Sequence, residues 1–263
     1  MRKIEDIFDT FLERFAKKQK RRDEDEIEFW DRHWEKRIEY TRETGMPYEL
    51  SDFWQQRIYE RMHKLFSRVL SPLEGKHILE AGCGSGFSSI KLAQDGAKIH
   101  LLDESRMALE YAELIASMMG LEEIDIQEGD LFDMPFTDEV YDATWNSGVI
   151  EHYDDETAVD IIEEMARVTR AGGRVMLTVP NLFTPEIIYR MFKVGKGSER
   201  FYTKRKLRYV IEQSGLQNVQ TYNLDCVIPS FVPKSLINFL SPFDRYFDPM
   251  GFLYIGSGDV PEK

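Results

Sequence analysis

The spacing of hydrophobic residues changes once along the chain. Over residues 1–70 the apolar side chains recur every three or four positions, which is typical of amphipathic α-helices. Gly45 and Pro47 interrupt this spacing, because both residue types disfavour a helix interior. The sequence therefore predicts a helical N-terminal extension over residues 1–70. The positions that carry the pattern are Ile4, Ile7, Phe8, Phe11, Leu12 and Phe15, then Ile27, Trp30, Trp34 and Ile38, then Phe53, Ile58, Met62, Leu65, Phe66 and Val69.

Two roles fit this N-terminal extension. Its many charged residues suit a solvated layer of helices packed on another domain. The same helices would also serve as a lid over a small-molecule site. The hydrophobic pattern does not separate these two roles, so both stay open.

Short apolar runs separated by helical stretches replace this pattern beyond Ser71 and Pro72. Short apolar runs of this kind are typical of strands buried in a parallel sheet. Their alternation with helices predicts a doubly wound α/β sheet with helices on both faces. The predicted strands cover residues 78–79, 99–102, 124–127, 141–145 and 174–179, and the predicted helices cover 88–94, 106–119 and 156–169.

The C-terminal part follows a different pattern. Residues 219–227 and 252–255 are two further strand candidates, and the segment between them is rich in Phe and Pro and has no clear crossover helix. Two strands without a crossover helix are expected to pair antiparallel. We therefore predict one domain over residues 71–263 with insertions at about 182–205 and 228–250.

The charge and the cysteine content restrict the classes of partner. The net charge is −13, and the one dense basic run, residues 17–22, is followed at once by four acidic residues. Nucleic acid is disfavoured as a partner, because contacts to phosphates need clustered Lys and Arg. Cys83 and Cys226 are the only cysteines, too few for a disulfide framework. With no signal peptide and no apolar stretch long enough to span a bilayer, we expect a cytoplasmic protein.

Three glycines follow the first predicted strand of the sheet. Gly82, Gly84 and Gly86 would let the backbone approach a ligand closely at the start of the next helix. Nicotinamide and flavin enzymes use a similar loop, but their fingerprint would place the third glycine at Phe87. The position of Gly86 therefore favours a different cofactor.

Acidic residues end the next two predicted strands. Asp103 lies about 20 residues beyond Gly82, where a carboxylate can accept hydrogen bonds from both ribose hydroxyls. Asp130 could accept a hydrogen bond from an adenine amino group, and the backbone N–H of Leu131 could reach the ring. The alternatives are an N-cap for Asp103 and a turn residue for Asp130. Their positions at successive strand ends favour an adenosine site.

These motifs together resemble those of class I S-adenosylmethionine-dependent methyltransferases, and of their type 11-like small-molecule subgroup. The resemblance rests on residues 80–86 (EAGCGSG) and 141–152 (YDATWNSGVIEH), together with Asp103 and Gly129-Asp130, and extends from about residue 77 to 181. It implies a seven-stranded sheet whose last strand is antiparallel.

The resemblance also assigns roles to residues. It implies that Gly82 and Gly84 hold the methionine part of the cofactor, that Asp103 binds the ribose and that Asp130 binds the adenine. Met107 would pack on the adenine, or would be a plain core residue. The remaining candidate cofactor-binding residues are Glu80, Gly86, Glu104, Leu131 and Asn146.

His152 is the candidate catalytic residue, because it follows the fourth predicted strand and would lie near the transferred methyl group. It would act as a general base, or alternatively as a structural hydrogen-bonding residue. Glu151 and His152 also match part of the metal site of ubiquinone-biosynthesis and small-RNA methyltransferases. Gly148 stands where their pattern has a further Glu, so we predict no bound metal ion.

The sequence says little about the methyl acceptor. Asn146-Ser-Gly replaces the Asn/Asp-Pro-Pro-aromatic motif of methyltransferases that modify nucleic-acid bases, which disfavours that acceptor class. The aromatic residues of the two insertions could wall an apolar pocket, form a satellite core or contact a membrane surface. These residues are Tyr189, Phe192, Phe201 and Tyr202, then Phe231, Phe239, Phe243, Tyr246 and Phe247.

We therefore expect methyl transfer to the oxygen or nitrogen of a small-molecule acceptor, with carbon also possible. A non-catalytic S-adenosylmethionine-binding regulator is the main alternative, because it would keep the same cofactor residues. A nicotinamide-dependent oxidoreductase is disfavoured by Phe87.

Overall fold

The computed structural model describes residues 24–51, 53–121, 124–181, 184, 200, 202–224 and 253–262. The predicted helix over residues 4–15 and the basic run at 17–22 lie outside the described residues. Most of the two predicted insertions lies outside them as well, including all of the aromatic residues named above except Tyr202. In the described part, no helix is long and apolar enough to cross a membrane.

Two of the three predicted N-terminal helices lie in the described part of the chain. Helix α2 covers Glu24–Thr44 and helix α3 covers Phe53–Val69, with a short 3-10 helix η1, Tyr48–Leu50, between them. Gly45 follows α2 with a positive φ of 68°, a conformation that glycine adopts without strain. Pro47 then caps η1. The predicted break between the two helices is therefore confirmed.

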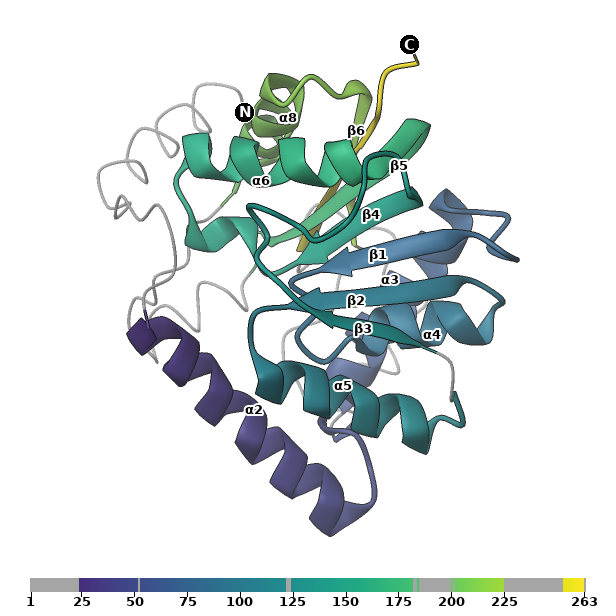
Figure 1. Ribbon diagram of the computed structural model, residues 1–263, viewed down its shortest axis with the longest axis vertical. Helices are drawn as coiled ribbons and strands as arrows, with labels where there is room; N and C mark the ends of the chain where they lie inside the picture. The colour runs from purple at the N-terminus through teal and green to yellow at the C-terminus, as the bar shows by residue number, and fades with distance from the viewer. Residues whose placement is uncertain are drawn as a thin grey trace.

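The centre of the molecule is a seven-stranded sheet with the order β3-β2-β1-β4-β5-β7-β6 (Figure 1). Strands β1 to β5 are parallel, and β7 runs antiparallel to both β5 and β6. This confirms the predicted doubly wound sheet and its antiparallel C-terminal pair. The strands are β1, His77–Ala81; β2, Lys98–Asp103; β3, Asp125–Glu128; β4, Tyr141–Ser147; β5, Thr169–Pro180; β6, Gln217–Asn223; and β7, Leu253–Asp259.

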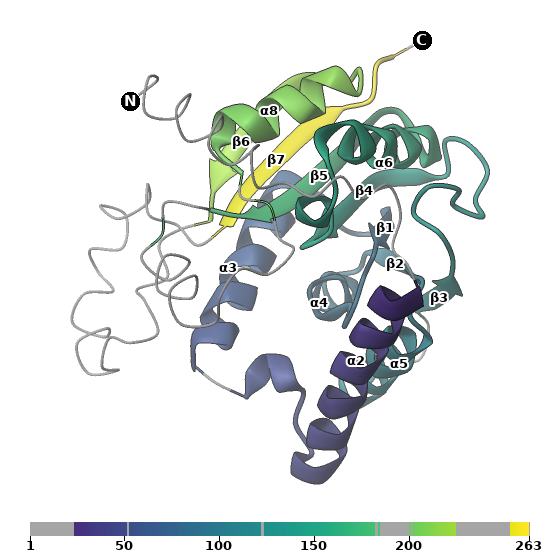
Figure 2. The same ribbon diagram turned by 90° about the vertical axis from the view of Figure 1, so that its left-hand side faces the viewer.

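Helices cover both faces of the sheet, as Figures 1 and 2 show. Helices α4, Phe87–Gln94, and α5, Arg106–Met118, lie with α3 on one face, and α6, Asp155–Val168, and α8, Lys204–Gln213, lie on the other. Helix α2 packs along α5 (Figure 2). Helix α8 was not predicted, because its apolar stripe consists of only Leu207, Val210 and Ile211 among basic and polar residues.

Each face of the sheet carries its own hydrophobic core. Ile78 of β1 packs in the cluster under α3, α4 and α5, and the next residue, Leu79, packs in the cluster under α6 and α8. Both side chains are fully buried, since successive residues of a strand point to opposite faces. Tyr202 is also fully buried in the second cluster. For this residue the structure supports the satellite-core interpretation.

The strand order reverses between β1 and β4. Chain connections from β1 lead outward to β2 and β3, whereas those from β4 lead outward to β5 on the other side. A crevice forms at such a reversal, outside the carboxyl ends of the strands, because the adjacent connections diverge. The loop after β1 and the loop after β4 therefore meet at this edge of the sheet.

We expect Gly256→Ala to destabilise the fold. A Cβ at Gly256 of β7 would collide with Ile211 Cδ1 and would lie 3.0 Å from Leu207, both on α8. Overpacking of this kind costs about 1–3 kcal/mol of unfolding free energy. Ile211→Val alone should cost about 1 kcal/mol, because it leaves a small void. The double variant should lose less than the sum of the two, as measured by urea unfolding. Strict additivity would contradict this close contact.

Candidate functional site

The loop between β1 and α4 is fixed to the end of β2 by its backbone. Gly82 and Cys83 both donate N–H hydrogen bonds to the carbonyl of Leu102, at 2.8 and 2.9 Å. Gly82, Gly84 and Gly86 all have positive φ angles, between 52° and 72°. Side chains other than glycine rarely adopt this conformation, so the sequence of the loop determines its path.

Each of the three glycines also brings the loop close to a neighbouring element. A Cβ at Gly82 would lie 2.8 Å from Val149, and one at Gly84 would lie 2.7 Å from the Trp34 ring. A Cβ at Gly86 would lie 2.5 Å from Leu101 of β2. Gly86 therefore allows α4 to pack on the sheet, whereas Gly82 and Gly84 hold the loop against β4 and α2.

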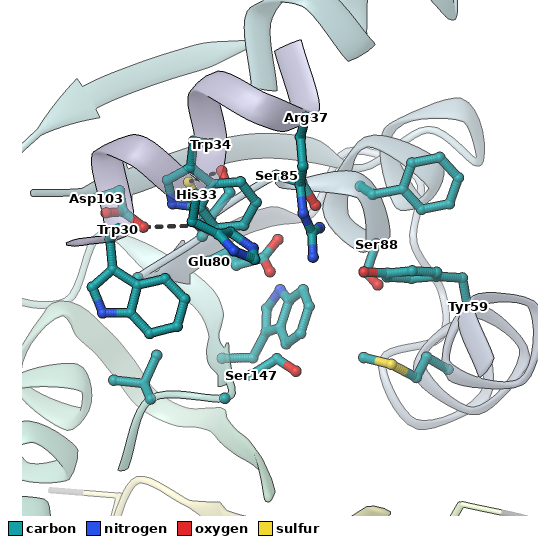
Figure 3. A pocket seen from close by; sticks show the side chains of 18 residues that line it. Trp30, His33, Trp34, Arg37, Tyr59, Glu80, Ser85, Ser88, Asp103 and Ser147 are labelled. Atoms are coloured by element: carbon teal, nitrogen blue, oxygen red, sulfur yellow. Dashed lines mark hydrogen bonds between the residues drawn. The ribbon is translucent and has the colours of Figure 1, made fainter. Parts of the chain in front are cut away.

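A cavity of about 240 Å³ lies beside this loop (Figure 3). Its walls come from the loop itself, from the carboxyl ends of β1, β2 and β4, and from helices α2 and α3. Four of the predicted cofactor-binding residues line it, namely Glu80, Gly82, Gly84 and Asp103. The structure thus brings residues from two successive strand ends into one site.

Glu80 is a buried carboxyl group in the wall of this cavity. Burial, with the nearby charge of Asp103, raises the pKa of Glu80 to about 8, although hydrogen bonds from Ser89 lower it. Its side chain is only 4% exposed, and among the described residues its Oε2 has no hydrogen-bond partner. Ser89 in turn accepts a 3.0 Å hydrogen bond from the indole of Trp145. At neutral pH the Glu80 carboxyl is therefore protonated, and one of its oxygens has no partner among the described residues.

Asp103 is oriented by backbone groups. Its Oδ2 accepts a 2.8 Å hydrogen bond from the N–H of Gly84, and its Oδ1 accepts a 3.0 Å bond from the N–H of Ser105. Ser105 caps α5, so the alternative of an N-cap role does not apply to Asp103 itself. The Ser105 hydroxyl also bonds to Asp31 of α2, at 2.5 Å. The Asp103 carboxylate is thus held at the cavity, and the bond between Asp31 and Ser105 attaches α2 to the end of β2.

One face of helix α2 forms a wall of the cavity, and none of its residues was among the predicted site residues. Trp30, His33, Trp34 and Arg37 all line it. Their spacing of three, four and seven residues places them on one face of a helix, and that spacing is the signal that could have identified them. Burial, and then the charges of Arg37 and Lys36, lower the pKa of His33 to about 4. His33 is therefore neutral at physiological pH.

Arg37 is the cation of this wall. Its Nη1 donates a 2.8 Å hydrogen bond to Glu49 of η1, whose side chain is fully buried. The guanidinium carbon lies 4.9 Å from the Trp34 ring centre and 4.7 Å from that of Tyr48. Figure 3 shows the side chain reaching from α2 toward Glu80 and Tyr59. A positive charge is thus held in a defined position inside the cavity.

The other predicted cofactor-binding residues are not among those that line the cavity. Leu131 lies next to the loop, and its Cδ1 is 3.4 Å from the position that a Cβ would occupy at Gly82. Asp130 accepts a 2.8 Å hydrogen bond from the N–H of Phe132, as expected of a turn residue. Glu104 and Met107 are partly exposed after β2. Asn146 is buried on the opposite side of the sheet, against Met165 of α6.

The predicted base, His152, lies one residue layer away from the cavity. It ends the 3-10 helix η2, Ile150–His152, and is 9% exposed. Its ring is edge-on to that of Trp30, with centres 5.7 Å apart. Trp30 is one of the residues that line the cavity, whereas His152 is not among them. Its role as a base stays a prediction.

Two other chemistries receive no support from the described residues. Burial, with the charges of Asp103 and Glu80, raises the pKa of the Cys83 thiol well above its usual value, so this cysteine is not a reactive thiolate. Cys226 lies outside the described residues. In the part of the chain that the structure covers, no three His, Cys, Asp or Glu side chains are grouped so as to hold a metal ion.

Comparisons with known proteins agree with this arrangement. Residues 78–173 match the family described as a methyltransferase domain. An O-methyltransferase of Aspergillus sclerotiorum is 31% identical over 120 residues, which is 45% of each protein. A probable S-adenosylmethionine-dependent methyltransferase of Mycolicibacterium smegmatis is 28% identical over 128 residues, covering 48% of this chain and 46% of that protein. The chain therefore spans less than half the length of these curated relatives.

The fold is also found among solved structures. The structure of a possible histamine N-methyltransferase from Thermotoga maritima superposes with a TM-score of 0.62 at 14% identity. The superposition covers 88% of this chain and 97% of that one, so the likeness includes elements on both sides of the matched domain. Given the glycine-loop site and the family match, residues 78–173 form an S-adenosylmethionine-dependent methyltransferase domain, and the described chain has the fold of these solved structures.

Proposed function

We propose that this protein transfers a methyl group from S-adenosylmethionine to the oxygen or nitrogen of a small molecule. The observation that carries the proposal is the cavity beside the glycine loop, where Gly84 and Asp103 face the buried carboxyl of Glu80. The names of the similar proteins, an O-methyltransferase and a possible N-methyltransferase, support both acceptor atoms. The low cysteine count supports a cytoplasmic location as part of the same proposal.

The residues around the cavity fit the parts of this cofactor. Glu80 has an unpartnered buried oxygen, which suits the ammonium of the methionine part. The absence of a side chain at Gly84 lets the loop lie against the Trp34 ring, and both residues line the cavity. Asp103 stands at the end of β2, where the ribose hydroxyls would lie. Leu131, beside the loop, would border the adenine together with Met107 and Asp130. The N–H of Gly129 donates a 3.1 Å hydrogen bond to the carbonyl of Asp103 and so joins the ends of β2 and β3.

The protein's own contribution to methyl transfer would be alignment and the exclusion of water. The cofactor, when bound, would supply a methyl group activated by its sulfonium, and S-adenosylhomocysteine would be the leaving group of an in-line displacement. Trp30 and Trp34 of α2 cover the cavity with apolar surface and would keep water from the reacting atoms. If the acceptor loses a proton, a neutral imidazole is needed nearby. His152 is the proposed base, and its ring contacts Trp30, which lines the cavity.

Titration calorimetry with S-adenosylmethionine, S-adenosylhomocysteine and NAD is the direct test. We expect both sulfur-containing ligands to bind and NAD to give no heat of binding, because the loop lacks the dinucleotide spacing. Methyl-labelled cofactor incubated with a pool of small metabolites should then yield a labelled product. Binding of S-adenosylmethionine without any labelled product would favour the non-catalytic regulator. Binding of NAD alone would contradict S-adenosylmethionine as the cofactor.

The buried Glu80 predicts that cofactor binding releases a proton. In the free protein Glu80 is protonated below about pH 8. A ligand ammonium beside it favours the carboxylate, so affinity should rise with pH, by up to about tenfold per pH unit, between about pH 6 and 7.5. Calorimetry in buffers of different ionisation enthalpy should show the proton release at neutral pH. Glu80→Gln should bind more weakly and without this pH dependence; an unchanged slope would assign the proton to another group.

Gly84→Ala should weaken S-adenosylmethionine binding by tenfold or more, because a Cβ at this position collides with Trp34 and forces the loop or α2 to move. Gly120→Ala is the matched control. Gly120 also has a positive φ, of 73°, but no atom lies within 4 Å of its Cβ position. Both variants should lose about 1–2 kcal/mol of stability from backbone strain, but only Gly84→Ala should lose affinity. Equal affinities of the two variants would show that the close approach at Gly84 is not needed.

A further inference from the structure

We propose that Arg37 of helix α2 binds the carboxylate of the cofactor's amino-acid end, so that residues outside the matched domain select the cofactor. This inference rests on the proposed function and adds a second charged group to the same site. Arg37 lies 41 positions before the start of the family match at residue 78. Glycine-loop motifs therefore give no indication of it.

The position of Arg37 is fixed before any ligand arrives. The hydrogen bond to Glu49 uses one N–H of a guanidinium group that carries five. The rings of Trp34 and Tyr48 flank the guanidinium at 4.9 and 4.7 Å, which restricts its rotation. A side chain held in this way loses little entropy when it binds an anion.

Glu49 is itself held by a second helix. Its other carboxylate oxygen accepts a 2.7 Å hydrogen bond from the hydroxyl of Tyr111, on α5. Burial and the charge of Glu49 raise the pKa of Tyr111, so this hydroxyl keeps its proton and remains a donor. Tyr111 also accepts a 2.9 Å bond from the N–H of Tyr48. The chain of contacts from α5 through Glu49 to Arg37 is therefore buried and polar, and it aims the guanidinium at the cavity.

The opposite wall carries the complementary group for an amino acid. Glu80 lines the same cavity, and in the described part of the chain no hydrogen bond or ion pair joins it to Arg37, whose partner is Glu49. Tyr59 is within electrostatic range of both. Ser88, only 4% exposed, lines the cavity too, and its Oγ has no hydrogen-bond partner among the described residues. A zwitterion would satisfy both walls, with its ammonium on Glu80 and its carboxylate on Arg37.

A purely structural role for Arg37 explains less. Pairing with Glu49 would account for the buried carboxylate of η1, but it leaves Glu80 Oε2 and Ser88 Oγ without partners inside a cavity. Buried polar atoms are almost always hydrogen-bonded, so unpartnered ones on residues that line a cavity point to a polar ligand. The two unpartnered atoms and the held cation lie around one space, which fits the amino-acid end of the cofactor.

Decarboxylated S-adenosylmethionine provides the test, because it lacks only the carboxylate. Calorimetry on the full chain should show that the intact cofactor binds about 10- to 100-fold more tightly than the decarboxylated form, as expected for a charge-assisted hydrogen bond. Arg37→Gln should weaken binding of the intact cofactor by a similar factor and leave the decarboxylated form unchanged or tighter. Arg37→Lys should recover part of the loss, because it keeps the charge without the planar fork.

Arg32→Gln is the matched control. Arg32 lies on the same helix, pairs with Glu28 at the surface, and has a side chain that is 59% exposed. This variant should bind both ligands like the wild type, and circular dichroism should show that all variants are folded. Equal weakening of both ligands by Arg37→Gln, or no effect on either, would overturn the proposal while wild-type binding upholds the proposed function. A wild type that binds neither ligand would overturn both.

Discussion

Two backbone hydrogen bonds to a single carbonyl organise the site. The N–H groups of Gly82 and Cys83 both point at the carbonyl of Leu102, which joins the end of β1 to the end of β2. This pairing turns the chain sharply, and the positive φ angles of the loop glycines follow from it. It also brings the N–H of Gly84 to Asp103, so the backbone and the carboxylate face the same cavity. The start of α4 and the walls of the site depend on this turn.

Two buried glutamates near this cavity have opposite environments. Glu49 accepts hydrogen bonds from Arg37 and Tyr111, which offset the cost of burying its charge. Glu80 has no such cation, and burial keeps it protonated at neutral pH. The difference separates a carboxylate that positions a neighbour from a carboxyl group with an oxygen that has no partner among the described residues.

Two segments of the chain supply the walls of the cavity. The matched domain, residues 78–173, supplies the glycine loop and the ends of β1, β2 and β4. Helices α2 and α3 supply the aromatic and cationic wall. Contacts between Asp31 and Ser105, and between Thr41 and Tyr111, attach α2 to α5 and so to the domain. The described part of the N-terminal extension packs on the domain and contributes a wall of the cavity, and its role as a lid stays a prediction.

The sequence by itself determined the order of the strands along the chain, the glycine loop and the acid at the end of β2, because these depend on local periodicity and on backbone conformations that only glycine adopts easily. Helix α8 was missed, since its three apolar residues give too short a stripe. Only the tertiary structure placed Arg37 and Glu49 at the cavity and turned Asn146 toward α6, because such contacts join residues far apart in the chain and depend on how helices pack on the sheet.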